Sequence, residues 1–337
     1  MLMVIVLFLL FEGIIYLASL PFRKTIKTSS NVDECIKARK RLRVVKILLT
    51  IFLLLLLIGI LCWIYTDNNF LKSEEMRRDF SRDIGLIIFY TIFRGGWQQL
   101  KGHINAYSKK EYLAKNPKGY VLFLRAFNDD DYGTVSPGCL WRKGNDTFEH
   151  RLSKAVKRIC HYKMCAVGMT KEVDAPYGAD RVYVSDLDWQ DDVKELMQKA
   201  KMIFILLRNR ESCLWEIGQS SDLLHKTCFI IDGQNSYEQT VSKLGGRIIF
   251  PEYDDIIATL KDNQVREEMK FHRAIIGLMI LDNQYLVFKT TCNDVRSLVE
   301  NAKQQTLYGK TTLQSIGTLK PGARRMNHQK SDRTESH

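Results

Sequence analysis

The sequence predicts an α/β protein: a parallel sheet with helices on both faces, preceded by an N-terminal transmembrane helical region. Apolar strands alternate with amphipathic helices through residues 119–260, as they do when crossover helices cover a parallel sheet. Two stretches nearer the N-terminus are long and apolar. The 337 residues leave room for one domain of ordinary size plus appendages.

Residues 1–97 form the predicted membrane region. The stretch 1–20 is interrupted only by Glu12, and 47–65 contains five consecutive leucines and no charged residue. A helix needs about 20 apolar residues to cross a bilayer. A third, shorter stretch at 84–97 is a candidate for a further crossing. We therefore expect a multi-pass protein of the cell inner membrane.

The net charge of +12 is concentrated outside the predicted α/β domain. Residues 22–46 hold nine basic and two acidic side chains, and residues 317–337 hold five and two. A basic loop beside a membrane is attracted to anionic lipid, whereas a nucleic-acid-binding domain would carry its charge on its own surface. We expect membrane lipid as a partner and no nucleic acid.

Two features of the sequence disagree on which side of the membrane the α/β domain lies. The positive-inside rule places the basic loop in the cytoplasm, so two crossings would put the domain outside. The eight cysteines, however, show no disulfide spacing and are typical of reduced interior residues. The chemistry argued below needs a cytosolic metabolite, and we therefore predict a cytoplasmic domain.

The remaining elements follow in chain order. A polar connector helix at 98–118 leads into the domain at 119–260, C-terminal helices occupy 261–316, and a basic tail at 317–337 is predicted to be disordered. Within the domain, periodicity predicts strands at 120–127, 164–168, 182–184, 202–207, 228–232 and 247–250, and helices at 147–162, 188–200 and 212–225. The C-terminal helices are expected at 267–281 and 293–305.

The stretch 188–224 carries the candidate chemistry. It contains a helix, the apolar strand 202–207, a polar loop, and a second helix that bears Trp215 and Glu216. This order places a carboxylate just past the C-terminal end of a buried strand, where open α/β sheets form their ligand crevices.

Residues 120–250 resemble a TIR-like domain, the flavodoxin-like module of immune signalling and bacterial defence. The resemblance rests on the strand that ends in Arg125-Ala126-Phe127, on Trp189 before the strand 202–207, and on the helix with Trp215-Glu216. An FLRxF-type sequence and a GAxRxY sequence, at 123–127 and 178–183, make it similar to a membrane-tethered bacterial subset. The spacing departs from the family, because Trp215 adjoins Glu216 and Ser212 lies only four residues before it.

The resemblance implies an enzyme that cleaves the bond between nicotinamide and ribose in NAD, in antiphage defence. Glu216 would be catalytic, and Arg125, Phe127, Trp215 and Ser212 would bind NAD, which is substrate rather than cofactor. A carboxylate stabilises the oxocarbenium character that develops on the ribose, and nicotinamide leaves as a neutral base. The family also implies a homo-oligomer, formed through the TIR-like domain and the transmembrane helices.

Several alternatives remain open. Ser212 could cap its helix with Glu216 in a capping role, Phe127 could belong to the core, and Arg125 could pair with Asp129–Asp131. Those contiguous aspartates point in different directions, so we predict no metal site. The domain could instead be a catalytically silent TIR-like scaffold that oligomerises at the membrane, or a nucleoside deoxyribosyltransferase-like enzyme.

Overall fold

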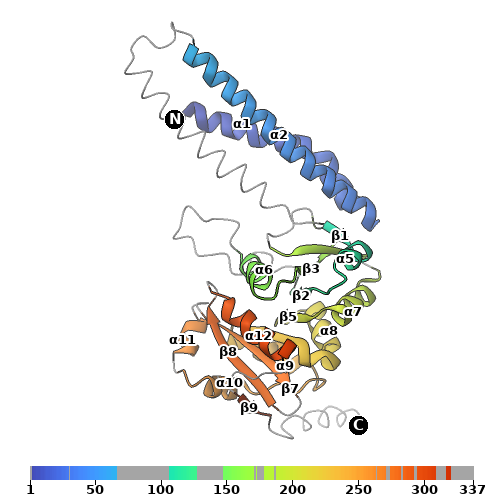
Figure 1. Cartoon of the computed structure of the whole chain (residues 1–337), viewed down its shortest axis with the longest axis vertical. Coiled ribbons are helices and arrows are strands. Elements are labelled where there is room, and N and C mark those ends of the chain that lie inside the picture. The colour runs from blue at the N-terminus through green and yellow to red at the C-terminus, as the bar shows by residue number, and fades with distance from the viewer. Residues whose placement is uncertain are drawn as a thin grey trace, which may run out of the picture.

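The protein consists of a long helical hairpin and an α/β domain (Figure 1). The hairpin is formed by α1 (Leu2–Thr28) and α2 (Val32–Thr66). The computed structural model describes residues 2–29, 31–66, 106–126, 147–170, 172, 178–185, 187–262, 264–270, 274–281, 284–291, 294–308 and 316–319.

The α/β domain is built on a nine-stranded mixed sheet in the order β1-β4-β3-β2-β5-β6-β7-β8-β9. All neighbours from β1 to β6 pair in parallel, and β7, β8 and β9 continue the sheet antiparallel. The α/β class stands, but the prediction of an all-parallel sheet is wrong. The strands are β1 (Ala106–Ser108), β2 (Val121–Leu124), β3 (Met164–Met169), β4 (Asp180–Val184), β5 (Met202–Leu206), β6 (Thr227–Ile231), β7 (Ala274–Leu281), β8 (Gln284–Thr291) and β9 (Ile316–Thr318).

The direction in which the chain builds the sheet reverses between β2 and β5. From β2 the chain passes through α6 (Phe148–Ile159) to β3 on one side, and after β4 it crosses through α7 (Trp189–Lys199) to β5 on the other side. Such a reversal is a topological switch point, and the crevice outside the carboxyl ends of the two strands is the usual ligand site. The fold therefore singles out the ends of β2 and β5.

Helices cover both faces of the sheet. Helix α6 and α12 (Arg296–Tyr308) pack on one face, and α5 (Lys109–Lys115), α7, α8 (Glu211–Gln219), α9 (Gln234–Lys243) and α10 (Tyr253–Leu260) pack on the other. In β5, Phe204 belongs to the α6 side and Ile205 to the α8 side. Central strands are buried on both faces, which explains why they are apolar throughout instead of alternating.

The C-terminal part differs most from the sequence prediction. The stretch 267–281, expected as one helix, is divided between α11 (Val265–Lys270) and β7. A short apolar run has no periodicity that separates a buried strand from a buried helix. Residues 247–250, expected as a strand, bury Ile248 and Phe250 without joining the sheet. The helix expected at 293–305 is present as α12.

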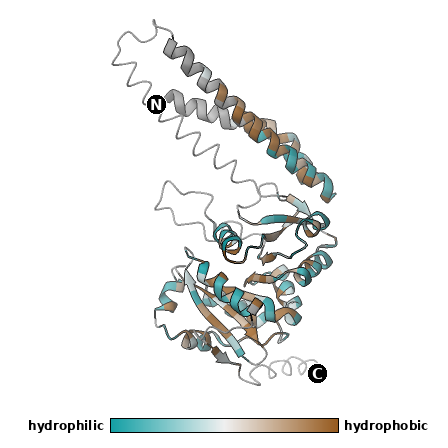
Figure 2. Cartoon of the chain, in the orientation of Figure 1, coloured by the Kyte–Doolittle hydropathy of each residue, from teal (hydrophilic) through white to brown (hydrophobic). Residues whose placement is uncertain are grey.

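The predicted transmembrane region is wrong. No helix in the described ranges combines the length and the apolar composition that a bilayer crossing needs. The basic segment expected as a loop between two spans is instead largely helical, in α1 up to Thr28 and in α2 from Val32. Ile26, Ala38 and Leu42 of the two helices form a small buried cluster. Hydrophilic and hydrophobic residues alternate along this part of the hairpin (Figure 2). The prediction of a multi-pass inner-membrane protein depended on the spans at 1–20 and 47–65, and it is therefore wrong as well. The stretch 84–97 lies outside the described residues.

Candidate functional site

The candidate site lies at the carboxyl ends of β2 and β5. Arg125 directly follows β2, and Glu216 comes from α8, the helix that follows β5. Helix α8 begins at Glu211, one residue earlier than predicted, and its N-cap residue Arg210 makes no side-chain cap hydrogen bond. Ser212 is therefore not the cap, and Glu216 lies in the second turn, too far along α8 for a capping box.

Glu216 is a deeply buried carboxyl group. Its side chain belongs to the buried face of α8 and the residue is 2% exposed. Within the described part of the chain, Glu216 Oε2 is buried without a hydrogen-bond partner. Burial raises the pKa of Glu216 to about 8, and the positive charge of Arg125 opposes the rise. Because burial penalises a charge, Glu216 is mostly protonated at neutral pH.

Arg125 is held from its other side by Glu149, in the first turn of α6. Arg125 Nε donates to Glu149 Oε2 at 3.0 Å, and Arg181 Nη2 donates to the same oxygen at 3.1 Å. The second oxygen, Glu149 Oε1, accepts the backbone N–H of Ala179 at 3.0 Å. The partners of Arg125 that the sequence suggested, Asp129–Asp131, lie outside the described part of the chain.

Glu149, which the sequence did not single out, contacts Arg125 at the candidate site. A signal was present: Glu149 follows the buried Phe148 in the first helical turn after β2, on the sheet side of the helix. Thr147 caps this helix, because its hydroxyl accepts the N–H of His150 at 3.2 Å. The cap fixes the residue at which α6 begins, and it thereby fixes the position of Glu149 beside Arg125.

The helical hairpin contacts the same edge of the sheet through Arg39 of α2. Arg39 Nη2 donates to the backbone oxygen of Thr170 at 2.8 Å and to that of Glu172. Its guanidinium lies 3.7 Å from the ring centroid of Tyr183. Arg39 is thus 9% exposed, and it ties the hairpin to the segment after β3.

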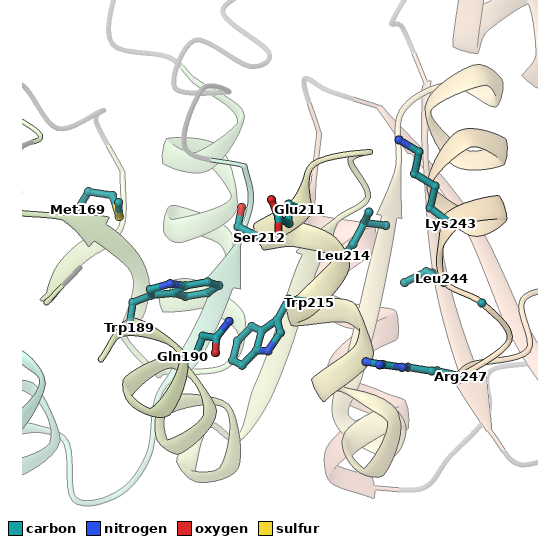
Figure 3. Close-up of a pocket in the computed structure, with 11 residues that line it drawn as sticks. Met169, Trp189, Gln190, Glu211, Ser212, Leu214, Trp215, Lys243, Leu244 and Arg247 are labelled. Atoms are coloured by element: carbon teal, nitrogen blue, oxygen red, sulfur yellow. The ribbon is translucent and has the colours of Figure 1, made fainter. Parts of the chain in front are cut away.

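A separate open cavity of about 870 Å³ crosses the outer side of α8. Ser212 and Trp215 line it, together with Trp189 from the start of α7 (Figure 3). The two indole rings meet edge to face, with centroids 4.8 Å apart. Lys243 and Arg247 line the opposite side of this cavity, which we call the α8 groove.

The structure divides the predicted residues between two places. Arg125 and Glu216 come together at the sheet edge, whereas Ser212 and Trp215 line the α8 groove. Glu216 does not line that groove, because it lies on the inner side of the helix whose outer side carries Trp215. Phe127 lies outside the described residues.

Comparison of the chain with protein-family models, with curated protein sequences and with solved structures found no match.

Proposed function

We propose that the protein cleaves the N-glycosidic bond between nicotinamide and ribose in NAD, with Glu216 as the catalytic carboxylate. One observation carries the proposal: Glu216 is a buried carboxyl whose Oε2 has no hydrogen-bond partner in the described part of the chain. The positive charge of Arg125 acts on Glu216 and lowers its pKa against the effect of burial. Glu216 lies on the helix that follows β5, one of the two strands at the switch point of the sheet. Strongly perturbed acids at such places are candidate catalytic groups.

The chemistry needs one carboxylate and one water molecule. The electron pair of the ribose C1′–N bond moves to the pyridinium nitrogen, so nicotinamide leaves as a neutral base without needing a proton. Positive charge then builds on the ribose, and ionised Glu216 would stabilise it. Water adds to C1′ and releases one proton, which yields ADP-ribose. Arg125 would bind the phosphates of NAD near the same edge.

The protonation state of Glu216 fits this role only when substrate is present. Burial raises its pKa to about 8 in the free protein. A bound pyridinium cation favours the ionised carboxylate and lowers that pKa. NAD would therefore switch Glu216 to its catalytic form as it binds, with release of a proton near pH 7.

A second candidate function is assembly without catalysis. It is favoured by the fact that Glu216 is 2% exposed and does not line the α8 groove. A carboxyl that substrate never reaches would serve only the architecture of the domain. Signalling would then depend on association between copies of the chain.

The test is nicotinamide release from NAD by the full-length chain, measured by chromatography with and without a crowding agent. We expect release by the wild type, and at least a hundredfold loss in Glu216→Gln, a loss of about 3 kcal/mol of transition-state stabilisation. Glu211→Gln removes an exposed carboxyl from the same helix and serves as the matched control. Undiminished release by Glu216→Gln would refute the catalytic role.

The same assay separates the alternatives. If NAD stays intact under every condition while light scattering shows concentration-dependent association, the assembly function is favoured. If free base is released from deoxynucleosides and NAD is untouched, the enzyme belongs to the deoxyribosyltransferase class instead.

A further inference from the structure

We propose that the α8 groove binds a mononucleotide, with the base on Trp189 and Trp215 and the phosphate at the turn 243–247. The inference does not rest on the proposed function, since Glu216 lies on the other side of α8. The cavity of about 870 Å³ falls within the range of roughly 300–1,000 Å³ that small-molecule sites occupy.

The phosphate end of the groove is a glycine turn after α9. The backbone of Leu244 has the right-handed helical conformation, with φ −73° and ψ −9°. Gly245 and Gly246 follow with positive φ angles of 62° and 78°. A right-handed residue followed by a left-handed one turns successive N–H groups toward one concavity, which is an anion-binding nest. Nothing lies within 4 Å of a Cβ built on either glycine, so this turn is open to a ligand.

Hydrogen bonding and charge point to the same end. The N–H of Leu244 donates to the backbone oxygen of Val241 in α9 at 3.3 Å, and the N–H of Arg247 donates to that of Leu244 at 3.5 Å. Among the described residues we find no acceptor for the N–H groups of Gly245 and Gly246. Lys243 and Arg247 flank them, both exposed, and neither forms an ion pair with any residue that the structure describes. Two cations and two N–H donors fit a phosphate.

The other end of the groove is aromatic. Trp215 and Trp189 are both partly exposed, both line the cavity, and their rings pack edge to face (Figure 3). Stacking of a base on an aromatic side chain contributes about 1–3 kcal/mol and tolerates any base. Ser212, on the same side of α8 as Trp215, adds a hydroxyl for a ribose oxygen.

Gly218 brings the two ends within reach of one ligand. A Cβ at Gly218 would lie 3.2 Å from Arg247 Nη1, so the guanidinium rests against α8 at this position. Trp215 lies three residues earlier, and residues three apart on a helix have Cβ positions about 5–6 Å apart. The guanidinium therefore lies about one helical turn from the Cβ of Trp215, whose indole extends from there toward Trp189. A flat base and a phosphate carried on one ribose match this arrangement, whereas phosphate alone leaves the indoles uncovered.

The test is titration of the full-length chain with AMP, adenosine and inorganic phosphate at low ionic strength, followed by tryptophan fluorescence and calorimetry. We expect AMP to quench the fluorescence and to bind at least tenfold more tightly than adenosine or phosphate. Lys243→Ala and Arg247→Ala should each weaken AMP binding about fivefold to tenfold and leave adenosine binding unchanged. Lys110→Ala, which removes an exposed lysine from α5, is the matched control.

Three results would overturn the inference. They are AMP binding no tighter than adenosine, AMP binding no tighter than inorganic phosphate, and AMP affinity unchanged in both cation variants. Glu216→Gln should bind AMP as the wild type does. Loss of AMP binding in Glu216→Gln would place the nucleotide at the sheet edge and contradict a separate groove site, whatever the outcome of the NAD assay.

Discussion

Arg125 forms a 3.0 Å ion pair with Glu149 while its charge lowers the pKa of Glu216 against the effect of burial. One guanidinium thus links α6, on one face of the sheet, with α8, on the other. The link lies at the switch point between β2 and β5. Perturbation of either carboxyl should therefore be measurable in both the stability and the chemistry of the domain.

Glu216 makes the stability of the protein depend on pH. Its pKa is 4.5 when unperturbed and about 8 in the folded protein. Between these values the folded state holds a proton that the unfolded state has lost. The contribution of protonated Glu216 to the free energy of unfolding is fully present below pH 4.5. It falls by about 1.4 kcal/mol per pH unit until the pH passes 8. Glu216→Gln should remove this slope, which denaturant unfolding from pH 5 to 8 measures. Parallel curves for the two proteins would contradict the raised pKa.

Glu149→Gln should destabilise the domain strongly. The substitution leaves the buried Arg125 and Arg181 without the carboxylate charge that they share. Removal of one member of a buried ion pair costs about 3–5 kcal/mol. Denaturant unfolding at pH 7 checks the loss. Glu111→Gln, which weakens solvent-exposed pairs with Lys40 and Lys115, should change the unfolding free energy by about 1 kcal/mol or less. Equal effects of the two substitutions would refute the special role of Glu149.

Arg39→Lys should loosen the contact between the hairpin and the sheet. A lysine keeps the charge and can still donate to the carbonyls of Thr170 and Glu172, but its ammonium cannot lie flat over the ring of Tyr183 as the planar guanidinium does. We expect backbone amides at the end of β3 to exchange hydrogen about tenfold faster or more, which corresponds to about 1.4 kcal/mol. Lys40→Ala is the neighbouring control. Exchange at wild-type rates in Arg39→Lys would show that the contact carries no stability.

Gly277→Ala should destabilise the antiparallel half of the sheet. A Cβ at this position would lie 2.1 Å from the ring of Phe288 and 2.7 Å from Leu298 Cδ1, so both of these buried side chains would have to move. Overpacking of this kind costs about 1–3 kcal/mol. Thermal unfolding monitored by circular dichroism measures the loss. At Gly233, where an added Cβ meets nothing within 4 Å, the same change should cost less than about 1 kcal/mol.

The sequence was sufficient for elements whose own residues carry a strong pattern. The apolar strand 202–207 and the helix after it appear as β5 and α8, because a continuous apolar run followed by amphipathic residues has few alternatives. It failed for β7, whose eight apolar residues fit a buried helix equally well. It also failed for the hairpin, where apolar composition was taken for membrane spans and the basic residues between them for a loop.

By itself, the sequence determined the α/β class and the position of Glu216 after a central strand. Only the tertiary structure decided that Glu149 holds Arg125, that Glu216 is buried on the inner side of α8, and that Trp215 packs against Trp189 on its outer side. Local patterns follow from helix and strand periodicity, which the chain carries within a few residues. Contacts between residues 24 or more positions apart depend on the order in which strands join the sheet, and that order is decided by the packing of the whole domain.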